Sequence, residues 1–305
     1  MRASSVALRP ASAVPLDLVA GLLGRAFADA PMPAGAGPAA FSARTLDATV
    51  ARDDILLDSS YVATVDGAPA GVALVAARPA RGGPRTRLAG MGVVREARRA
   101  GVARALLGRV VADARGRGSL AVVLEVFEGN RAAVRLYEGG GFVASRRLLG
   151  FSLPIEGLPA DDPPIVTLRP VAAPMLLPLF GVCASEGPAE AAPPWQLEAV
   201  SLARLGPFAA VYAIVERGGA RPAGYVALTG EGPGARLVGL GIVPARRRLG
   251  LAARALGALG ALYPDIAALS LAPLVPERST LVPFLAAVGA APVADGAQVE
   301  MVAHL

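Results

Sequence analysis

Two short loops of arginine and glycine are the segments of this sequence best suited to chemistry. Both have the frame Arg-x-x-Gly-x-Ala, as RRAGVA at Arg98–Ala103 and RRLGLA at Arg247–Ala252. Each lies between an apolar stretch and a helical pattern, so its backbone N–H groups begin a helix and lack intrahelical partners. The helix dipole favours an anion there, and arginine adds charge-assisted donors. This arrangement suits a phosphate or pyrophosphate; the alternative is an ordinary strand-to-helix turn with solvated arginines.

The loops belong to a longer internal repeat. The strand patterns before them, RLAGMGVV at Arg87–Val94 and RLVGLGIV at Arg236–Val243, lie 149 residues apart (236 − 87). That period is too long for a solenoid unit of roughly 20–50 residues and indicates a duplicated domain. The length of 305 residues also fits about two domains. We expect domains at 1–155 and 165–305, joined by a proline-rich linker at 156–164.

Local patterns predict the elements around the first loop. The spacing of apolar residues predicts a helix over Val102–Ala114, and the apolar run Leu120–Phe127 predicts a strand covered on both faces. A short helix over Arg131–Glu138 follows, and then two final strands at Phe142–Arg147 and Leu149–Leu153. The fold class is α/β, of the α+β mixed-sheet kind, with helices flanking one twisted sheet in each half.

Composition excludes several classes of function. A single cysteine, Cys183, permits neither an intrachain disulfide nor a multi-cysteine metal site, and the single histidine, His304, argues against a Ser-His-Asp triad. The net charge is +6, but aromatic residues make up 5%, which argues against nucleic-acid binding. Apolar runs stay below the ~18 residues that cross a bilayer, and the start of the sequence lacks a signal-peptide pattern. We expect a cytoplasmic protein without metal or membrane contact.

Two side chains after the first loop are candidate acid–base groups. Glu125 interrupts the apolar run AVVLEVF, where a charge is costly unless it has a partner. Such a carboxylate suits a general base, and an ion pair with one of the many arginines is the alternative. Tyr137 suits a general acid, and packing of its ring in the core is its alternative.

The segment LEVFEGNRAAVRLYEGGGF, together with the loop RRAGVA and the strand before it, resembles the GCN5-related N-acetyltransferase (GNAT) superfamily. The resemblance covers the first half and, more weakly, the second. The glutamate of LEV followed by this tyrosine is similar to protein N-terminal alanine acetyltransferases of the RimI type. Asn130, the only asparagine of the chain, stands where that family often has one; as an alternative or in addition, it caps the next helix.

The resemblance implies an acetyl-CoA-dependent N-acetyltransferase that works in a ternary complex without metal. The sheet would open between the strands ending near Val94 and Phe127, with coenzyme A in the opening and a backbone bulge near Gly92–Val94. Tyr137 would protonate the leaving thiolate, and Glu125 would take the proton of the amine. The cofactor-binding residues implied are Met91, Gly92, Val93, Val94, Arg98, Arg99, Ala100, Gly101, Val102, Ala103, Arg104 and Asn130.

The second half keeps the loop but loses the acid. Aligned through the glycine turns, Leu285 stands at the position of Tyr137 and Arg278 at that of Asn130. Pro283 falls within the short helix, where proline costs roughly 3 kcal/mol in an interior position. We therefore expect a degenerate GNAT domain with a structural role and, at most, a vestigial coenzyme site.

The acceptor is not readable beyond its class, a small-molecule amine or a peptide N-terminus. The sequence offers negative charge for it at Asp29, Asp47, Asp53 and Asp54, residues that solvated helix faces also carry. Two alternatives stay open: a non-catalytic acyl-CoA-binding or regulatory protein, and a transferase that uses another acyl-CoA. The duplication is compatible with a monomer, which is then a pseudo-dimer, or with a homodimer.

Overall fold

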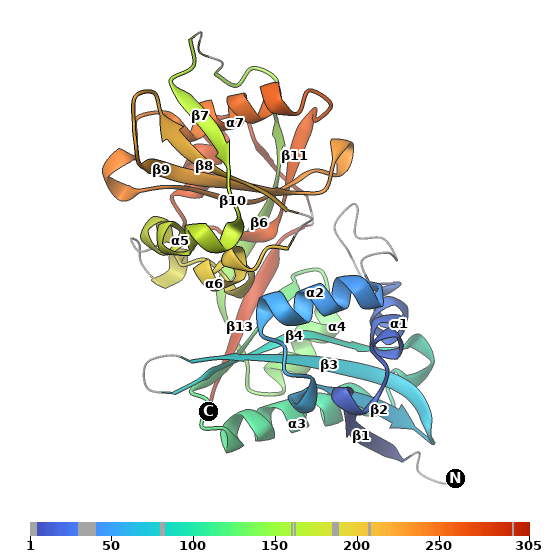
Figure 1. Cartoon of the computed structure of the whole chain (residues 1–305). Helices are drawn as coiled ribbons and strands as arrows, with labels where there is room; N and C mark the ends of the chain where they lie inside the picture. The colour runs from blue at the N-terminus through green and yellow to red at the C-terminus, as the bar shows by residue number, and fades with distance from the viewer. Residues whose placement is uncertain are drawn as a thin grey trace. The chain divides into compact units, whose positions relative to one another are not determined.

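The computed structural model describes residues 5–29, 41–79, 83–159, 161, 163–184, 189–206, 209–294 and 296–305. The chain forms two compact units, each a mixed α/β domain (Figure 1). The first unit is Met1–Arg146 with Gln298–Leu305, and the second is Arg147–Ala297. The expected fold class is confirmed in both.

The first unit has one mixed sheet in the order β1-β2-β3-β4-β5-β13. Its elements are β1 (Val6–Pro10), α1 (Leu16–Phe27), α2 (Ala43–Asp53), β2 (Tyr61–Val65), β3 (Ala68–Arg78), β4 (Arg85–Val93), α3 (Val102–Gly116), β5 (Ala121–Phe127), α4 (Arg131–Glu138) and β13 (Gln298–His304).

Alternation along the strands divides the first unit into two layers of side chains. Val122, Leu124 and Val126 of β5 point into a core shared with α3 and α4. Residues between them, Glu125 among them, point to the other face of the sheet, because successive side chains of a strand alternate. Helices α1 and α2 lie on the side of the sheet opposite α3 (Figure 1).

The second unit has its sheet in the order β6-β11-β10-β9-β8-β7, with β12 paired to β6. Its elements are β6 (Val143–Pro154, whose first four residues belong to the first unit), β7 (Val166–Pro170), α5 (Leu177–Ala184), α6 (Ala199–Ala203), β8 (Ala209–Glu216), β9 (Pro222–Thr229), β10 (Arg236–Ile242), α7 (Leu251–Leu262), β11 (Ala268–Pro276), α8 (Leu281–Ala287) and β12 (Ala291–Pro292). One core packs α7 and α8 on the sheet, and another packs α5 and α6.

The division into units differs from the expected domains 1–155 and 165–305. Expected strands Phe142–Arg147 and Leu149–Leu153 form one strand, β6, which pairs with β11 from Leu148↔Pro276 to Pro154↔Ala268. The C-terminal strand β13 pairs antiparallel with β5, from Gln298↔Phe127 to His304↔Ala121 (Figure 1). Each half of the sequence therefore supplies a strand to the unit built mainly by the other half.

The repeat is also visible in backbone geometry. Against its neighbour, β4 has a register shift between Leu88 and Gly90, and β10 has one between Leu237 and Gly239. In the first unit the extra residue is Ala89. The bulge therefore lies three residues before Gly92–Val94, the segment near which it was expected. Bulges bend a strand and increase its twist, so both strands turn away from their parallel neighbours beyond these points.

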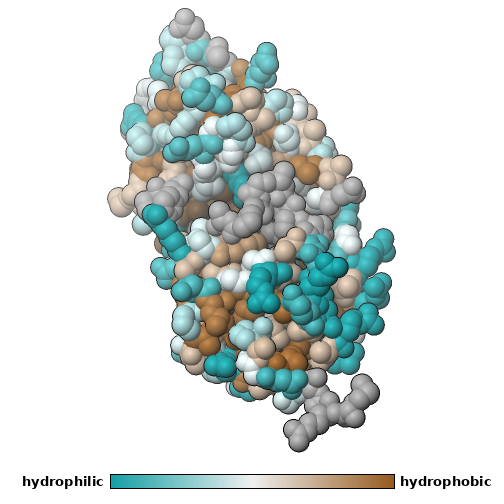
Figure 2. Space-filling view, turned by 90° about the vertical axis from the view of Figure 1, so that its right-hand side faces the viewer, coloured by the Kyte–Doolittle hydropathy of each residue, from teal (hydrophilic) through white to brown (hydrophobic). Residues whose placement is uncertain are grey.

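Hydrophilic and hydrophobic residues are mixed on the face drawn in Figure 2. No helix of the described residues is long and apolar enough to cross a membrane. Within the same residues, no three His, Cys, Asp or Glu side chains come together as a metal site.

Candidate active site

The sheet of the first unit opens between its two parallel strands. β4 and β5 are paired only from Arg85↔Ala121 to Arg87↔Val123. Beyond these pairs β4 runs on to Val93 and β5 to Phe127, so the expected opening between the two strand ends is present. The end of β4, where Met91, Gly92 and Val93 lie, pairs with β3 on its other edge.

The loop between β4 and α3 presents a row of unpaired donors. Its backbone takes the left-handed conformation at Arg99 (φ 68°) and Gly101 (φ 82°), and α3 then begins at Val102. The first helical hydrogen bond runs from the N–H of Ala105 to the carbonyl of Gly101, 3.0 Å away. Backbone N–H groups from Arg99 to Arg104 thus have no acceptor within the described part of the chain. Consecutive free amides with a helix dipole behind them form an anion site.

Arg98 points away from these amides. Its Nε donates to the Val93 carbonyl at 3.2 Å, and its Nη2 donates to the Ala26 carbonyl at 3.2 Å. Nη1 lies 3.1 Å from Asp29. The guanidinium expected on the pyrophosphate is instead bound to protein carbonyls, while the side chains of Arg99 and Arg104 are exposed beside the loop.

Gly92 is required by close packing. A Cβ at this position would lie 2.6 Å from the Cβ of Ala26 in α1, closer than side chains tolerate. Helix α1 therefore lies directly against the end of β4. Val94, the last residue expected to hold the acyl arm, is buried, and its N–H donates to the Ala70 carbonyl at 2.9 Å.

Glu125 is paired, as the alternative interpretation had it. Arg87 donates to Glu125 Oε2 from Nε at 3.0 Å and from Nη2 at 2.8 Å. Both side chains are buried, with 6% and 5% of their surface exposed. Nε also donates to Oε1, at 3.3 Å. A buried pair of this kind is costly to break, because the remaining charge would have no partner.

A second carboxylate lies beside the first. Glu300 on β13 pairs directly with Glu125 on β5, so both side chains point to the same face of the sheet. Glu300 accepts from Arg146 Nε at 2.9 Å and from Nη2 at 2.7 Å. The four residues form a charged row, Arg87–Glu125–Glu300–Arg146. The sequence pointed only to Glu125. Glu300 was missed because the pattern QVEMVAH predicts a strand but does not indicate that this strand pairs with β5.

Tyr137 is buried in the core below the sheet. Only 7% of the residue is exposed, and its ring lies 5.9 Å from that of Phe142. Desolvation raises the pKa of the phenol to about 12, so it stays protonated at neutral pH. Within the described residues its hydroxyl has no hydrogen-bond partner. A tyrosine hydroxyl without a protein partner is a donor available to a ligand.

Asn130 caps helix α4. Its Oδ1 accepts from the N–H of Ala133 at 3.2 Å, which satisfies one of the free amides of the first turn. The side-chain amide nitrogen makes no hydrogen bond to a described residue. Capping and a contact with a ligand are therefore compatible in this side chain.

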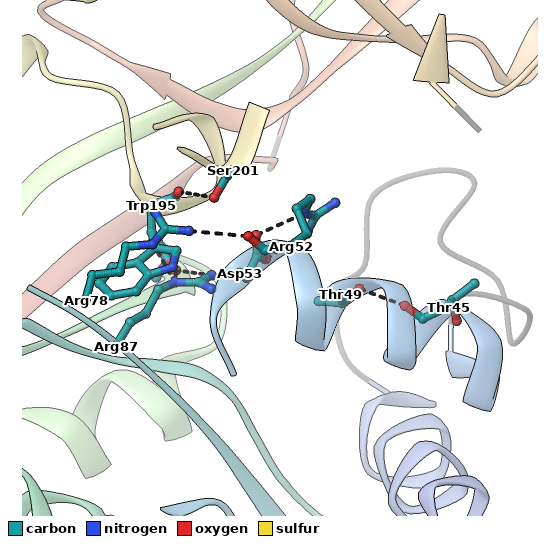
Figure 3. A network of polar contacts seen from close by, with 9 residues as sticks. Thr45, Thr49, Arg52, Asp53, Arg78, Arg87, Trp195 and Ser201 are labelled. Carbon is teal, nitrogen blue, oxygen red and sulfur yellow. Dashed lines mark hydrogen bonds and ion pairs between the residues drawn. The ribbon is translucent and has the colours of Figure 1, made fainter. Parts of the chain in front are cut away.

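Most of the aspartates proposed to attract an amine already have arginine partners. Asp53, buried at the end of α2, accepts from Arg52 Nε at 2.9 Å and from Nη2 at 2.8 Å (Figure 3). Asp54 lies 2.7 Å from Nε of Arg78. With Asp29 bound to Arg98, only Asp47 of the four is an exposed carboxylate without a described partner.

The second unit repeats the loop but not the acid–base groups. Arg248 and Gly250 have φ values of 66° and 73°, close to those of their counterparts. Leu285, fully buried in α8, takes the position of Tyr137. The N–H of Ala290 donates to the Leu285 carbonyl at 2.9 Å, as that of Phe142 does to Tyr137 at 3.0 Å.

The expected cost of Pro283 is wrong. Helix α8 begins only at Leu281, so this proline lies in the first turn. N–H groups of the first turn have no intrahelical acceptor, and proline loses none there.

Comparison with known proteins agrees with this geometry. Residues 32–142 match the model described as the acetyltransferase (GNAT) family. These residues are a GNAT domain. The matched family is one of N-acyltransferases, which assigns the first unit to that enzyme class. No curated protein sequence shows significant similarity to the chain.

Solved structures extend the likeness in fold to the whole chain. A tandem GNAT protein from the clavulanic acid biosynthesis pathway has 19% identity and a TM-score of 0.72, with 98% of each chain covered. A GCN5-related N-acetyltransferase from Sphaerobacter thermophilus has 14% identity and a TM-score of 0.65, covering 100% of this chain and 96% of that one. One from Anabaena variabilis has 14% identity and a TM-score of 0.64, with 98% and 72% covered. The chain therefore has the tandem GNAT fold.

Proposed function

We propose that the first unit is an acetyl-CoA-dependent N-acetyltransferase that transfers the acetyl group to a primary amine by direct attack in a ternary complex. The observation that carries this proposal is the row of free amides from Arg99 to Arg104 at the open edge of the sheet. They accommodate the coenzyme pyrophosphate, with Arg99 and Arg104 beside it. The pantetheine arm then runs along the edge of β4 at Met91–Val94, which β5 leaves unpaired.

The chemistry needs three proton movements. The acceptor ammonium loses a proton, and the free amine then attacks the thioester carbonyl to form the C–N bond. As the tetrahedral intermediate collapses, the nitrogen loses its second proton to solvent, the C–S bond breaks and the thiolate takes a proton. We assign this proton to Tyr137, whose phenol is protonated at neutral pH and has no described partner. Such assistance contributes typically ~10²–10⁴-fold in rate.

Glu125 is the proposed acceptor of the ammonium proton. Its carboxylate is buried on the face of the sheet opposite α3, and Arg87 holds its position with hydrogen bonds to both oxygens. Asn130 is assigned to the coenzyme through its side-chain amide nitrogen, while its oxygen caps α4.

Acetyl transfer is tested by thiol release from acetyl-CoA with a panel of acceptors: simple amines, peptides with free N-termini and aminoglycosides. We expect release with at least one class, and slower release with succinyl-CoA as donor. Binding of CoA without release for any acceptor would favour the alternative, a non-catalytic acyl-CoA-binding or regulatory protein.

The second unit is proposed to be a scaffold. Leucine at position 285 has no proton to donate, and β11 offers no carboxylate beside Arg236, which pairs with Ser270. We expect a cytoplasmic protein that works as a monomer or homodimer with one active unit per chain. Isothermal calorimetry with CoA tests this assignment, because one site per chain supports it and two sites contradict it.

A further inference from the structure

The first arginine of each loop makes the same pair of contacts in both units. In the first unit, Arg98 Nε donates to Val93 and Nη2 to Ala26. In the second, Arg247 Nε donates to the carbonyl of Ile242 at 3.1 Å and Nη2 to that of Cys183 at 2.9 Å. Both copies of the motif thus use this guanidinium in one way.

The two carbonyls lie on different elements. Val93 ends strand β4, and Ala26 belongs to the last turn of α1, whose final carbonyls lack intrahelical donors. A cation is also favoured at a helix C-terminus. Ala26 is held from a second side, because its methyl group packs on Gly92. The two hydrogen bonds of the Arg98 guanidinium therefore connect the end of α1 to the end of β4 and to the loop that carries Arg98.

The ion pair between Arg98 and Asp29 is not the source of this connection. Their side chains are 40% and 45% exposed, and exposed pairs contribute little. Arg247 makes the same two contacts to carbonyls in the second unit. The shared feature is the bridge between two carbonyls.

We propose that Arg98 is a positioning residue that transmits coenzyme binding to α1. This rests on the proposed function, since it takes the amides from Arg99 to Arg104 as the pyrophosphate site. An anion on those amides fixes the loop, and Arg98, which enters the loop, then fixes the end of α1. The coenzyme thereby orders the helix that lies against the acyl-binding end of β4.

The test is hydrogen exchange with and without CoA in the wild type and in Arg98→Lys. Lysine keeps the charge beside the loop but has no planar fork for two carbonyls. In the wild type, CoA is expected to slow exchange both at 99–104 and at 24–29. In Arg98→Lys, the protection at 99–104 is expected to persist, with a CoA Kd within about tenfold of wild type, while the CoA-dependent protection at 24–29 is lost.

Arg247→Lys is the matched control and is expected to leave both effects in the first unit unchanged. Protection of 24–29 by CoA that survives in Arg98→Lys would overturn the inference. Loss of CoA binding in that variant would make Arg98 a ligand and overturn it as well. Failure of CoA to protect 99–104 in the wild type would instead overturn the proposed coenzyme site. Should Arg98→Lys fold poorly by circular dichroism, Arg98→Gln, which keeps one donor, gives the same comparison.

Discussion

The space above the two Arg-x-x-Gly-x-Ala loops differs although their backbones agree. A Cβ built on Gly101 meets no heavy atom of a described residue within 4 Å, whereas one on Gly250 would lie 2.3 Å from Arg254 Nη1. Arg254 reaches this position while its Nε donates to Asp161 at 2.7 Å. The first loop is open to an anion, and the second has a side chain across it. The loop backbone is therefore the same in both units, and the side chain of Arg254 makes the space above the second loop different from that above the first.

The same contrast holds on the sheet. Arg87 has a buried carboxylate partner, Glu125, whereas Arg236, which stands at the same position of the repeat, has no described ion pair. Tyr137 has its counterpart in Leu285. This comparison predicts that substitutions at corresponding positions of the two units have different effects. Each pair of variants below tests that difference.

The largest expected effect is on stability. Arg87→Ala leaves Glu125 buried without its partner and is expected to lower the free energy of unfolding by about 3–5 kcal/mol. Arg236→Ala is expected to cost less than about 1 kcal/mol, since it breaks no ion pair with a described residue. Urea denaturation followed by circular dichroism measures both. An equal loss of unfolding free energy in the two variants would show that the ion pair between Arg87 and Glu125 does not stabilise the first unit.

Removal of the proposed acid is expected to affect turnover. Tyr137→Phe should lower kcat by about 10²-fold, because the thiolate then leaves without a proton, while the CoA Kd stays nearly unchanged. Leu285→Phe is the matched variant in the second unit and should leave kcat within about twofold. An unaltered kcat in Tyr137→Phe would remove this residue from the mechanism.

The loop glycines separate coenzyme binding from fold. Gly101→Ala places a methyl group over the amides and strains a left-handed residue, so the CoA Kd should rise by about tenfold. Gly250→Ala carries a similar backbone cost of roughly 1–2 kcal/mol but should not change the Kd. Calorimetry with CoA measures both. A weaker Kd in Gly250→Ala would place coenzyme in the second unit.

The smallest expected effect comes from the side chain over the second loop. Arg254→Ala removes a partly exposed ion pair with Asp161 and should change stability by less than about 1 kcal/mol. We expect one CoA per chain before and after the substitution. If the variant bound a second CoA, Arg254 alone would prevent coenzyme binding to the second loop. The backbones of the two loops would then be equally able to bind it.

Local elements followed closely from the sequence. The expected helix Arg131–Glu138 is α4 with the same bounds, and the expected helix Val102–Ala114 is α3, which continues to Gly116. The loop was found because its glycine, alanine and position before a helix are local features. The contacts of its first arginine could not be predicted, since a sequence does not reveal that this guanidinium donates to a carbonyl of α1.

The sequence by itself determined the duplication, the α/β class, the two Arg-x-x-Gly-x-Ala loops before a helix and the loss of the tyrosine in the second copy. Only the tertiary structure decided the exchange of β6 and β13 between the units and the row Arg87–Glu125–Glu300–Arg146 that depends on it. The physical reason is that the alternation of polar and apolar residues in a strand shows which of its faces is buried. Its neighbours in the sheet depend instead on hydrogen bonds to strands that are distant in sequence. Glu300 and Glu125, far apart in sequence, become neighbours through that pairing alone.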